Sequence, residues 1–133
     1  MRKRELERFR RKLLKMREEI LEELKEFEQE KLEQNMRERL GQVSAFTTHP
    51  ADIGSVTDEQ ERAFLLAAHK QKILDAVDEA LFRIEQGTYG KCRGCGKNIE
   101  MERLKAIPYA EYCLSCQEKI ENEGVPSQSR ILG

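Results

Sequence analysis

Two stretches of the chain repeat apolar residues every three or four positions. The first, residues 3–40, holds no Gly or Pro and is rich in Glu, Arg, Lys and Leu, which are strong helix formers. This spacing predicts a long amphipathic helix that pairs with another helix and ends at Gly41. Its narrow apolar stripe consists of Leu6, Phe9, Leu13, Met16, Ile20, Leu24 and Phe27, continued less regularly by Leu32, Met36 and Leu40.

The second periodic stretch begins at a capping-box pattern, Thr57-Asp58-Glu59-Gln60, and ends at Gln86-Gly87. A start at Ser55 is the competing interpretation. Its stripe consists of Ala63, Leu66, Lys70, Ile73, Val77, Ala80 and Ile84, flanked by Ala67, Leu74 and Leu81. Lys70 is unusual on such a stripe, but its stem can pack while its amine reaches the edge. Two helices with matching stripes predict an antiparallel coiled-coil hairpin.

A segment of different composition joins the two helices. Residues 41–56 are small and polar and include Pro50 and Gly54, so they are predicted to form the loop at the tip of the hairpin. The predicted organisation is therefore a hairpin over residues 1–86 with a tip loop of about 41–56. A small module over 87–122 and a flexible tail over 123–133 follow it.

All four cysteines of the chain lie in the small module. They form two C-x-x-C pairs, Cys92/Cys95 and Cys113/Cys116, and residues 96–112 lie between the pairs. Two such pairs at this separation are typical of a tetrahedral zinc site. Cys113 is expected to begin a short helix that runs to Asn122. Four thiolates leave no open position for water or substrate, so the predicted role of one Zn²⁺ ion is structural.

Three other interpretations of the cysteines compete with zinc. A C-x-x-C pair can be a redox dithiol, two disulfides can form in an oxidising compartment, and four cysteines can hold an iron–sulfur cluster. The zinc interpretation also explains how the module folds. Its large apolar residues are too few to bury a core, so metal binding is expected to supply the missing folding free energy, and chelation to unfold this module first.

Composition narrows the class of protein further. Charged residues make up 37% of the chain and hydrophobic residues 38%, which fits long solvated helices plus a small module. The net charge of −1 and the pI near 6.2 argue against a protein that coats nucleic acid. No apolar run long enough for a membrane span and no signal peptide follow the basic N-terminus, so a cytoplasmic protein is expected. We expect no enzyme, because no nucleophile–base set, phosphate loop or open metal site occurs.

The first helix is strongly basic at its start. The chain up to Lys15 holds eight basic and two acidic residues. Such a cluster can contact nucleic acid or an acidic protein surface, but a simple solvated helix face is the favoured interpretation.

The hairpin followed by the four-cysteine module resembles the DksA/TraR family of bacterial zinc proteins. Helix 57–86 and the module carry the resemblance, and the first helix matches only in kind. The matching residues are Tyr89-Gly90-Lys91-Cys92-Arg93-Gly94-Cys95-Gly96, Ile99, Arg103-Leu104, Ala106, Pro108-Tyr109-Ala110 and Cys113-Leu114-Ser115-Cys116. The resemblance implies a monomer that binds RNA polymerase rather than DNA. It also implies that the hairpin enters the secondary channel and that its tip modulates initiation near the catalytic centre.

The tip and the alarmone positions depart from the family pattern. The family's tip motif, Asp-x-x-Asp-x-Ala, falls on residues 49–54. Asp52 matches the second aspartate, whereas His49 and Gly54 replace the first aspartate and the alanine. The resemblance also places the basic residues of the family's guanosine tetraphosphate site at Ala76, Ile107 and Gln117, which cannot pair with phosphate. We therefore expect a regulator that acts without the alarmone or responds to it through a different surface. Asp52 is the expected effector of the tip.

Two rival functions remain open from the sequence. A nucleic-acid-binding zinc-ribbon protein would need a basic surface and would shift bare DNA in a gel. A coiled-coil adaptor capped by zinc would dimerise through its first helix, which sedimentation would detect.

Overall fold

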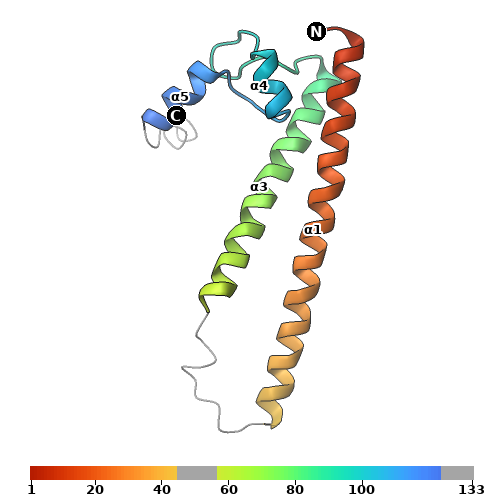
Figure 1. Cartoon of the computed structure of the whole chain (residues 1–133), viewed down its shortest axis with the longest axis vertical. Helices are drawn as coiled ribbons and strands as arrows, with labels where there is room; N and C mark the ends of the chain where they lie inside the picture. Colours follow the sequence, from red (N-terminus) through yellow and green to blue (C-terminus); the bar gives the residue numbers. More distant parts are fainter. Residues whose placement is uncertain (45–56, 124–133) are drawn as a thin grey trace. The chain divides into compact units, whose positions relative to one another are not determined.

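The computed structural model describes residues 1–44 and 57–123. Within these ranges the chain is helical, and no strand occurs beyond an isolated antiparallel bridge between Lys91 and Asn98. The helices are α1 (Lys3–Ser44), α3 (Asp58–Gln86), α4 (Met101–Ala106) and α5 (Leu114–Asn122). The predicted fold class, a mostly helical coiled-coil hairpin with a small four-cysteine module, is confirmed (Figure 1).

The α1 helix continues through Gly41 to Ser44, so its predicted end at Gly41 is wrong. A glycine inside a helix costs only about 1 kcal/mol relative to alanine, which is too little to stop a long helix by itself. The tip residues His49, Asp52 and Gly54 lie outside the described residues.

The two ends of α3 are fixed by the predicted local signals. Thr57 Oγ1 accepts a hydrogen bond from Gln60 N (3.1 Å), and Gln60 Oε1 accepts one from Thr57 N (3.0 Å), which is a reciprocal capping box. At the other end Gly87 has a φ of +76°, a value that favours glycine. Gly87 N donates to Ile84 O (3.2 Å) and Thr88 N to Arg83 O (2.9 Å), which is a Schellman motif.

The described chain divides into two compact units. Unit 1 combines residues 1–17 with the chain from Asp75 onward, and unit 2 comprises Glu18–Leu74. The small four-cysteine module over residues 87–122, called the finger below, therefore shares a compact unit with the first turns of α1 and the last part of α3. The domain boundary at residue 86 stays a prediction.

The core of unit 1 joins helix residues to finger residues. The buried apolar side chains are Phe9, Leu13, Val77 and Ala80 from the helices, and Tyr89, Ile99, Leu104 and Ala110 from the finger. The rings of Phe9 and Tyr89 lie 5.5 Å apart, and Tyr89 Oη donates to the Pro108 carbonyl (2.7 Å). The finger thus buries more apolar surface than its own residues provide, because α1 and α3 supply half of this core.

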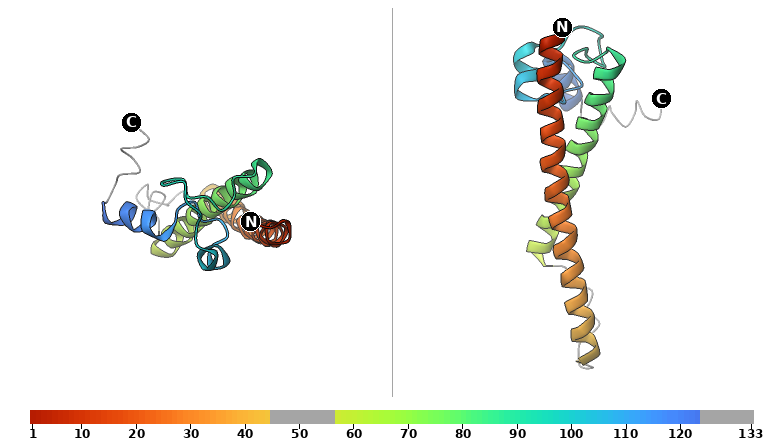
Figure 2. Two further views of the ribbon diagram at one scale, coloured as in Figure 1. Left: turned by 90° about the horizontal axis from the view of Figure 1, so that it is seen from above. Right: turned by 90° about the vertical axis from the view of Figure 1, so that its right-hand side faces the viewer.

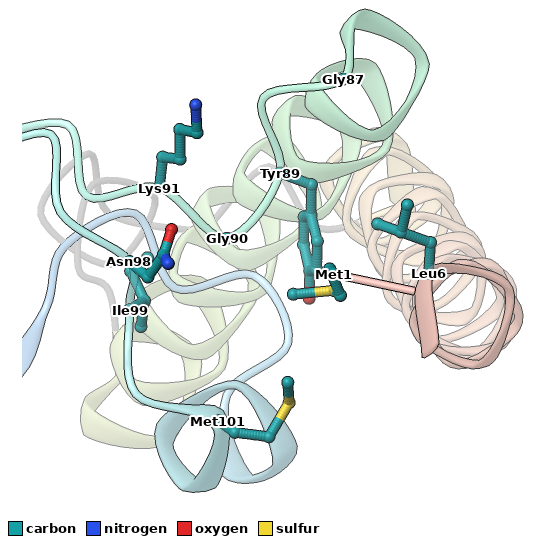
Figure 3. Close-up of a pocket in the computed structure, with 9 residues that line it drawn as sticks. All are labelled: Met1, Leu6, Gly87, Tyr89, Gly90, Lys91, Asn98, Ile99 and Met101. Carbon is teal, nitrogen blue, oxygen red and sulfur yellow. The ribbon is translucent and has the colours of Figure 1, made fainter. Parts of the chain in front are cut away.

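Tyr89 also borders a cavity of about 240 Å³ at the start of α1. Figure 3 shows its ring beside the Met1 side chain, with Leu6 and Met101 around them. Gly90, with a φ of +86°, passes so close to Met1 that a Cβ atom there would lie 2.9 Å from Met1 Cε. The Tyr-Gly pair of the sequence therefore has a packing reason: the tyrosine fills the core, and the glycine admits a neighbouring side chain.

In unit 2 the α1 and α3 segments run in opposite directions (Figure 1). Ile20 and Leu74 are buried in this unit. Lys70 is neutralised by an ion pair with Glu23, a partner that the sequence pattern alone did not reveal. Lys31 Nζ lies over the Phe64 ring, 5.5 Å from its centroid.

The outer apolar residues of α1 do not continue the stripe. Leu32, Met36 and Leu40 are 56%, 55% and 69% exposed, so the predicted continuation is wrong. At 100° per residue, Met36 points about 180° away from the direction of Phe27. The positions that do continue the stripe, Glu30 and Gln34, are polar. On α3, Leu66 is likewise 56% exposed. The buried apolar contacts between the two helices of unit 2 therefore do not extend to Leu66.

Among the helices of the described residues, none is both long and apolar enough to cross a membrane.

Candidate metal centre

The four cysteines come together in unit 1, on two knuckles. Their sulfur atoms all lie within 4.8 Å of one another, and Cys95 Sγ is 3.8 Å from Cys113 Sγ. None of the four forms a disulfide. A tetrahedral ion with metal–sulfur bonds of about 2.3 Å has sulfur–sulfur edges of about 3.8 Å. The four side chains therefore fit a single tetrahedral ion in both number and spacing.

The first knuckle is held by backbone hydrogen bonds around Cys92, which is only 3% exposed. Cys92 N donates to Lys97 O (2.8 Å), and Gly96 N donates to Cys92 O (3.0 Å). Gly96 has a φ of +76°, which lets the chain turn back after Cys95. Gly94 N donates to Cys92 Sγ (3.3 Å), a bond that favours the thiolate form of the ligand.

The second knuckle places its two sulfurs around the start of α5. Cys113 is the N-cap residue of this helix rather than part of it, and Cys116 lies in its first turn. The Glu100 carboxylate accepts a hydrogen bond from Leu114 N (3.2 Å). An acidic side chain from the segment before α4 therefore caps the helix that carries the last ligand.

Glu111 ties the two knuckles together. Its carbonyl accepts a hydrogen bond from Arg93 N (2.9 Å), and its carboxylate lies 3.4 Å from Arg93 Nη1. The same carboxylate is 3.9 Å from Nη1 of Arg83, which is 8% exposed and belongs to α3. Within the described chain, none of the three guanidinium nitrogens of Arg83 has a hydrogen-bond partner. The sequence pattern gave no signal for this Arg83–Glu111–Arg93 group.

The thiols of the cluster have opposite pKa shifts. Burial raises the pKa of the Cys92 thiol, but hydrogen bonds from the backbone of Cys113, Cys95 and Gly94 and from the Cys116 thiol outweigh it and lower the pKa to about 6. Hydrogen bonding to Cys92, and then to Cys113, raises the pKa of Cys116 to about 12. Without a metal, the Cys116 thiol therefore keeps its proton at neutral pH. A bound cation would replace that proton and favour the thiolate form of the ligands.

The glycine at position 94 is required by space rather than by its backbone angle. A Cβ atom there would lie 3.0 Å from Cys116 Sγ and 3.3 Å from Cys116 Cβ. We therefore expect Gly94→Ala to displace this ligand and to weaken zinc binding about tenfold or more. Competition with a coloured chelator measures the affinity, and Lys97→Ala, an exposed change in the same knuckle, is the control. Equal affinities for the wild type and Gly94→Ala would show that Cys116 has room to move.

Comparisons with known proteins agree with this architecture. Residues 87–122 match the family described as the prokaryotic dksA/traR C4-type zinc finger. The RNA polymerase-binding transcription factor DksA of Caulobacter vibrioides is 34% identical over 124 residues, which cover 91% of this chain and 79% of that protein. An uncharacterized protein of Aquifex aeolicus is 38% identical over 123 residues, which cover 92% of this chain and 81% of that protein.

A solved structure shows the same fold. The transcription factor DksA2 from Pseudomonas aeruginosa superposes with a TM-score of 0.71 and 28% sequence identity, covering 92% of this chain and 88% of that one. The helical hairpin and the four-cysteine finger together place this chain among zinc-finger proteins that carry a coiled coil. Within that class, the chain belongs to the DksA/TraR family.

Proposed function

We propose that this chain is a bacterial transcription regulator that binds RNA polymerase and enters its secondary channel with the hairpin. The tip would act near the catalytic centre and change the lifetime of the open promoter complex. The observation that carries the proposal is the hairpin joined to the four-cysteine finger, in a chain 34% identical to an RNA polymerase-binding transcription factor. In this proposal the protein works in the cytoplasm as a monomer and catalyses no reaction.

The dimensions of the hairpin support this mode of action. The α3 helix has 29 residues, which at about 1.5 Å per residue span about 44 Å. A pair of helices is about 20 Å across with its side chains, so it can pass where a globular domain cannot. Asp52 is the proposed effector of the tip, with His49 and Gly54 beside it.

The finger would serve as the structural base of the hairpin. We propose that Cys92, Cys95, Cys113 and Cys116 hold one Zn²⁺ ion, which their number and their sulfur spacing fit. With all four positions filled by thiolates, the ion would stabilise the fold and would take no part in a reaction. The Arg83–Glu111–Arg93 group then joins the knuckles to the end of α3.

Purified polymerase provides the direct test of the proposed function. The zinc-loaded protein should change the half-life of open complexes at promoters where these are short-lived, without retarding promoter DNA in the absence of polymerase. If it shifts bare DNA and leaves the half-life unchanged, a nucleic-acid-binding zinc ribbon is the better assignment.

We also propose that guanosine tetraphosphate does not act through this protein. The three positions that the family resemblance assigns to the alarmone, Ala76, Ile107 and Gln117, line one groove of about 440 Å³. Three carboxylates, Glu111, Glu118 and Glu121, line the same groove and would repel phosphate. The remaining residues of the groove are Arg103, Tyr109, Ala110, Tyr112 and Leu114.

We expect the alarmone to leave the effect of the protein unchanged on a polymerase that lacks every other alarmone site. Arg103, the cation of the groove, already donates its Nε hydrogen to the Tyr112 carbonyl (2.9 Å). The prediction is tested by measuring the half-life of open complexes in the presence of the protein, with and without guanosine tetraphosphate. An alarmone-dependent increase in the effect would mean that the groove, or another surface of this protein, binds it.

A further inference from the structure

The most uneven distribution of charge lies at the start of α1. The first 15 residues hold eight basic and two acidic residues, a net charge of +6, whereas the whole chain has a net charge of −1 and the remainder therefore −7. Five of these basic side chains lie on one face of the helix, about 100° or more from the buried Leu13. We call this set, together with Lys105 of α4, the basic face. Its members are Arg4, Arg8, Arg11, Lys12, Lys15 and Lys105, all exposed.

A contact between α1 and α4 shapes part of the basic face into a groove. Lys12 Nζ donates to the Lys105 carbonyl (2.7 Å), which brings α4 against the side of α1 (Figure 2). The groove has a volume of about 400 Å³, and three cations line it: Arg8, Lys12 and Lys105. Its other lining residues are Glu5, Phe9 and Met101. The groove therefore combines three positive charges, one carboxylate and an apolar floor.

The folding of the chain does not explain this cluster. Arg4, in the first turn of α1, faces the positive end of the helix dipole, which is the unfavourable end for a cation. Arg4 and Arg8, and likewise Arg8 and Lys12, are like charges four positions apart on one side of the helix. Glu7 pairs with Arg10 (3.8 Å) and with Arg11 (3.6 Å), and Glu102 pairs with Lys105 (3.6 Å), so these carboxylates offset only part of the charge of the basic face. A local arrangement that opposes folding is a mark of function.

We infer that the basic face binds a carboxylate-rich surface of RNA polymerase. The inference rests on the proposed function and adds a second contact, made by unit 1, to the one proposed for the tip. A protein surface fits better than nucleic acid, because the remaining net charge of −7 would repel a long polyanion. The apolar floor of Phe9 and Met101 also suits a protein side chain better than a phosphate backbone.

The test compares two triple variants for binding to core RNA polymerase from the same organism. Arg8→Gln with Lys12→Gln and Lys105→Gln neutralises the groove. Lys91→Gln with Lys97→Gln and Lys119→Gln removes the same charge from exposed positions of the finger that lie outside the basic face. Zinc content and helical circular dichroism establish that both variants fold. Dissociation constants are measured between about 50 and 500 mM salt, because screening weakens exposed charge contacts over this range.

The groove variant should bind polymerase about tenfold more weakly at low salt and approach the wild type at high salt, whereas the control stays within about twofold. If both variants bind like the wild type at every salt concentration, the inference is wrong and the proposed function stands. If the wild type itself does not bind polymerase, the proposed function fails and this inference fails with it. A groove variant that binds polymerase normally but loses the wild type's binding to a 30-base-pair DNA duplex would assign the face to nucleic acid.

Discussion

Removing the metal, by a strong chelator or by Cys113→Ser, is expected to unfold residues 88–122 while most of α1 and α3 stays helical. Structural zinc contributes an apparent free energy of about 10–16 kcal/mol in zinc-finger peptides, and a whole domain is stable by about 5–15 kcal/mol. The core that the finger shares with Phe9, Leu13, Val77 and Ala80 offsets part of that loss. It is too small to replace the metal.

Amide hydrogen exchange measures the stability of the finger and of α3 separately. Without metal, the amides of Cys92, Ile99 and Leu104 should exchange rapidly, and those of α3 between Ile73 and Val77 should stay protected. Ser115→Ala, an exposed change between the last two ligands, is the matched control and should keep both zinc and protection. Slow exchange throughout the finger of metal-free protein would mean that the shared apolar core is sufficient, and that the proposed role of zinc is wrong.

Asp52→Asn is expected to reduce the effect of the protein on the half-life of open complexes about tenfold or more. Its affinity for polymerase should stay within about twofold of the wild type. The substitution removes a negative charge at nearly constant size. It therefore tests whether the carboxylate acts on a cation, on basic residues or on a mobile element close to the catalytic centre. Open-complex half-lives at saturating protein report the effect, and a binding titration reports the affinity.

Glu59→Gln provides the control, because it removes one exposed carboxylate from the first turn of α3. It should lower the stability of α3 slightly, because it removes a favourable charge at the positive end of the helix dipole. Its effect on transcription should equal that of the wild type. A loss of binding in Asp52→Asn, with a normal effect for each bound complex, would make Asp52 an anchor and would contradict its role as the effector.

Local signals in the sequence predicted the α3 helix well. The capping box at Thr57 and Gln60 and the stop at Gly87 depend only on neighbouring residues, so the sequence contains all the information they need. The two C-x-x-C pairs are equally local, and their separation implies the geometry of the cluster. The long-range assembly of four sulfurs was therefore predictable, because the metal chemistry requires it.

Features that depend on tertiary packing were predicted less well. Leu32 follows Phe27 after five positions, a rotation of about 140°, and the two steps of four to Met36 and Leu40 add about 40° each. The three residues therefore lie on another side of the helix than the seven-residue pattern set by Leu13 and Ile20. The pairing of Lys70 with Glu23 depends on the register of the two helices, which the apolar stripes leave open.

The ion pair between Arg83 of α3 and Glu111 of the finger could not be foreseen from the sequence pattern. Arg83 and Glu111 lie 28 positions apart, and neither belongs to a recognisable motif. Arg83 follows the helical pattern of an exposed residue near a C-terminus, where a cation is favourable. It is buried because the finger folds back over the end of α3, an effect that only the packed structure contains.

The most direct measurement of the central claim is the binding of the zinc-loaded protein to its own core RNA polymerase, with and without a protein that already occupies the secondary channel. The account predicts saturable binding that the channel occupant abolishes in proportion to its own occupancy. Binding that persists at full occupancy of the channel, or no binding at all, would contradict entry of the hairpin. In that case the chain would be better described as a zinc-capped coiled-coil adaptor.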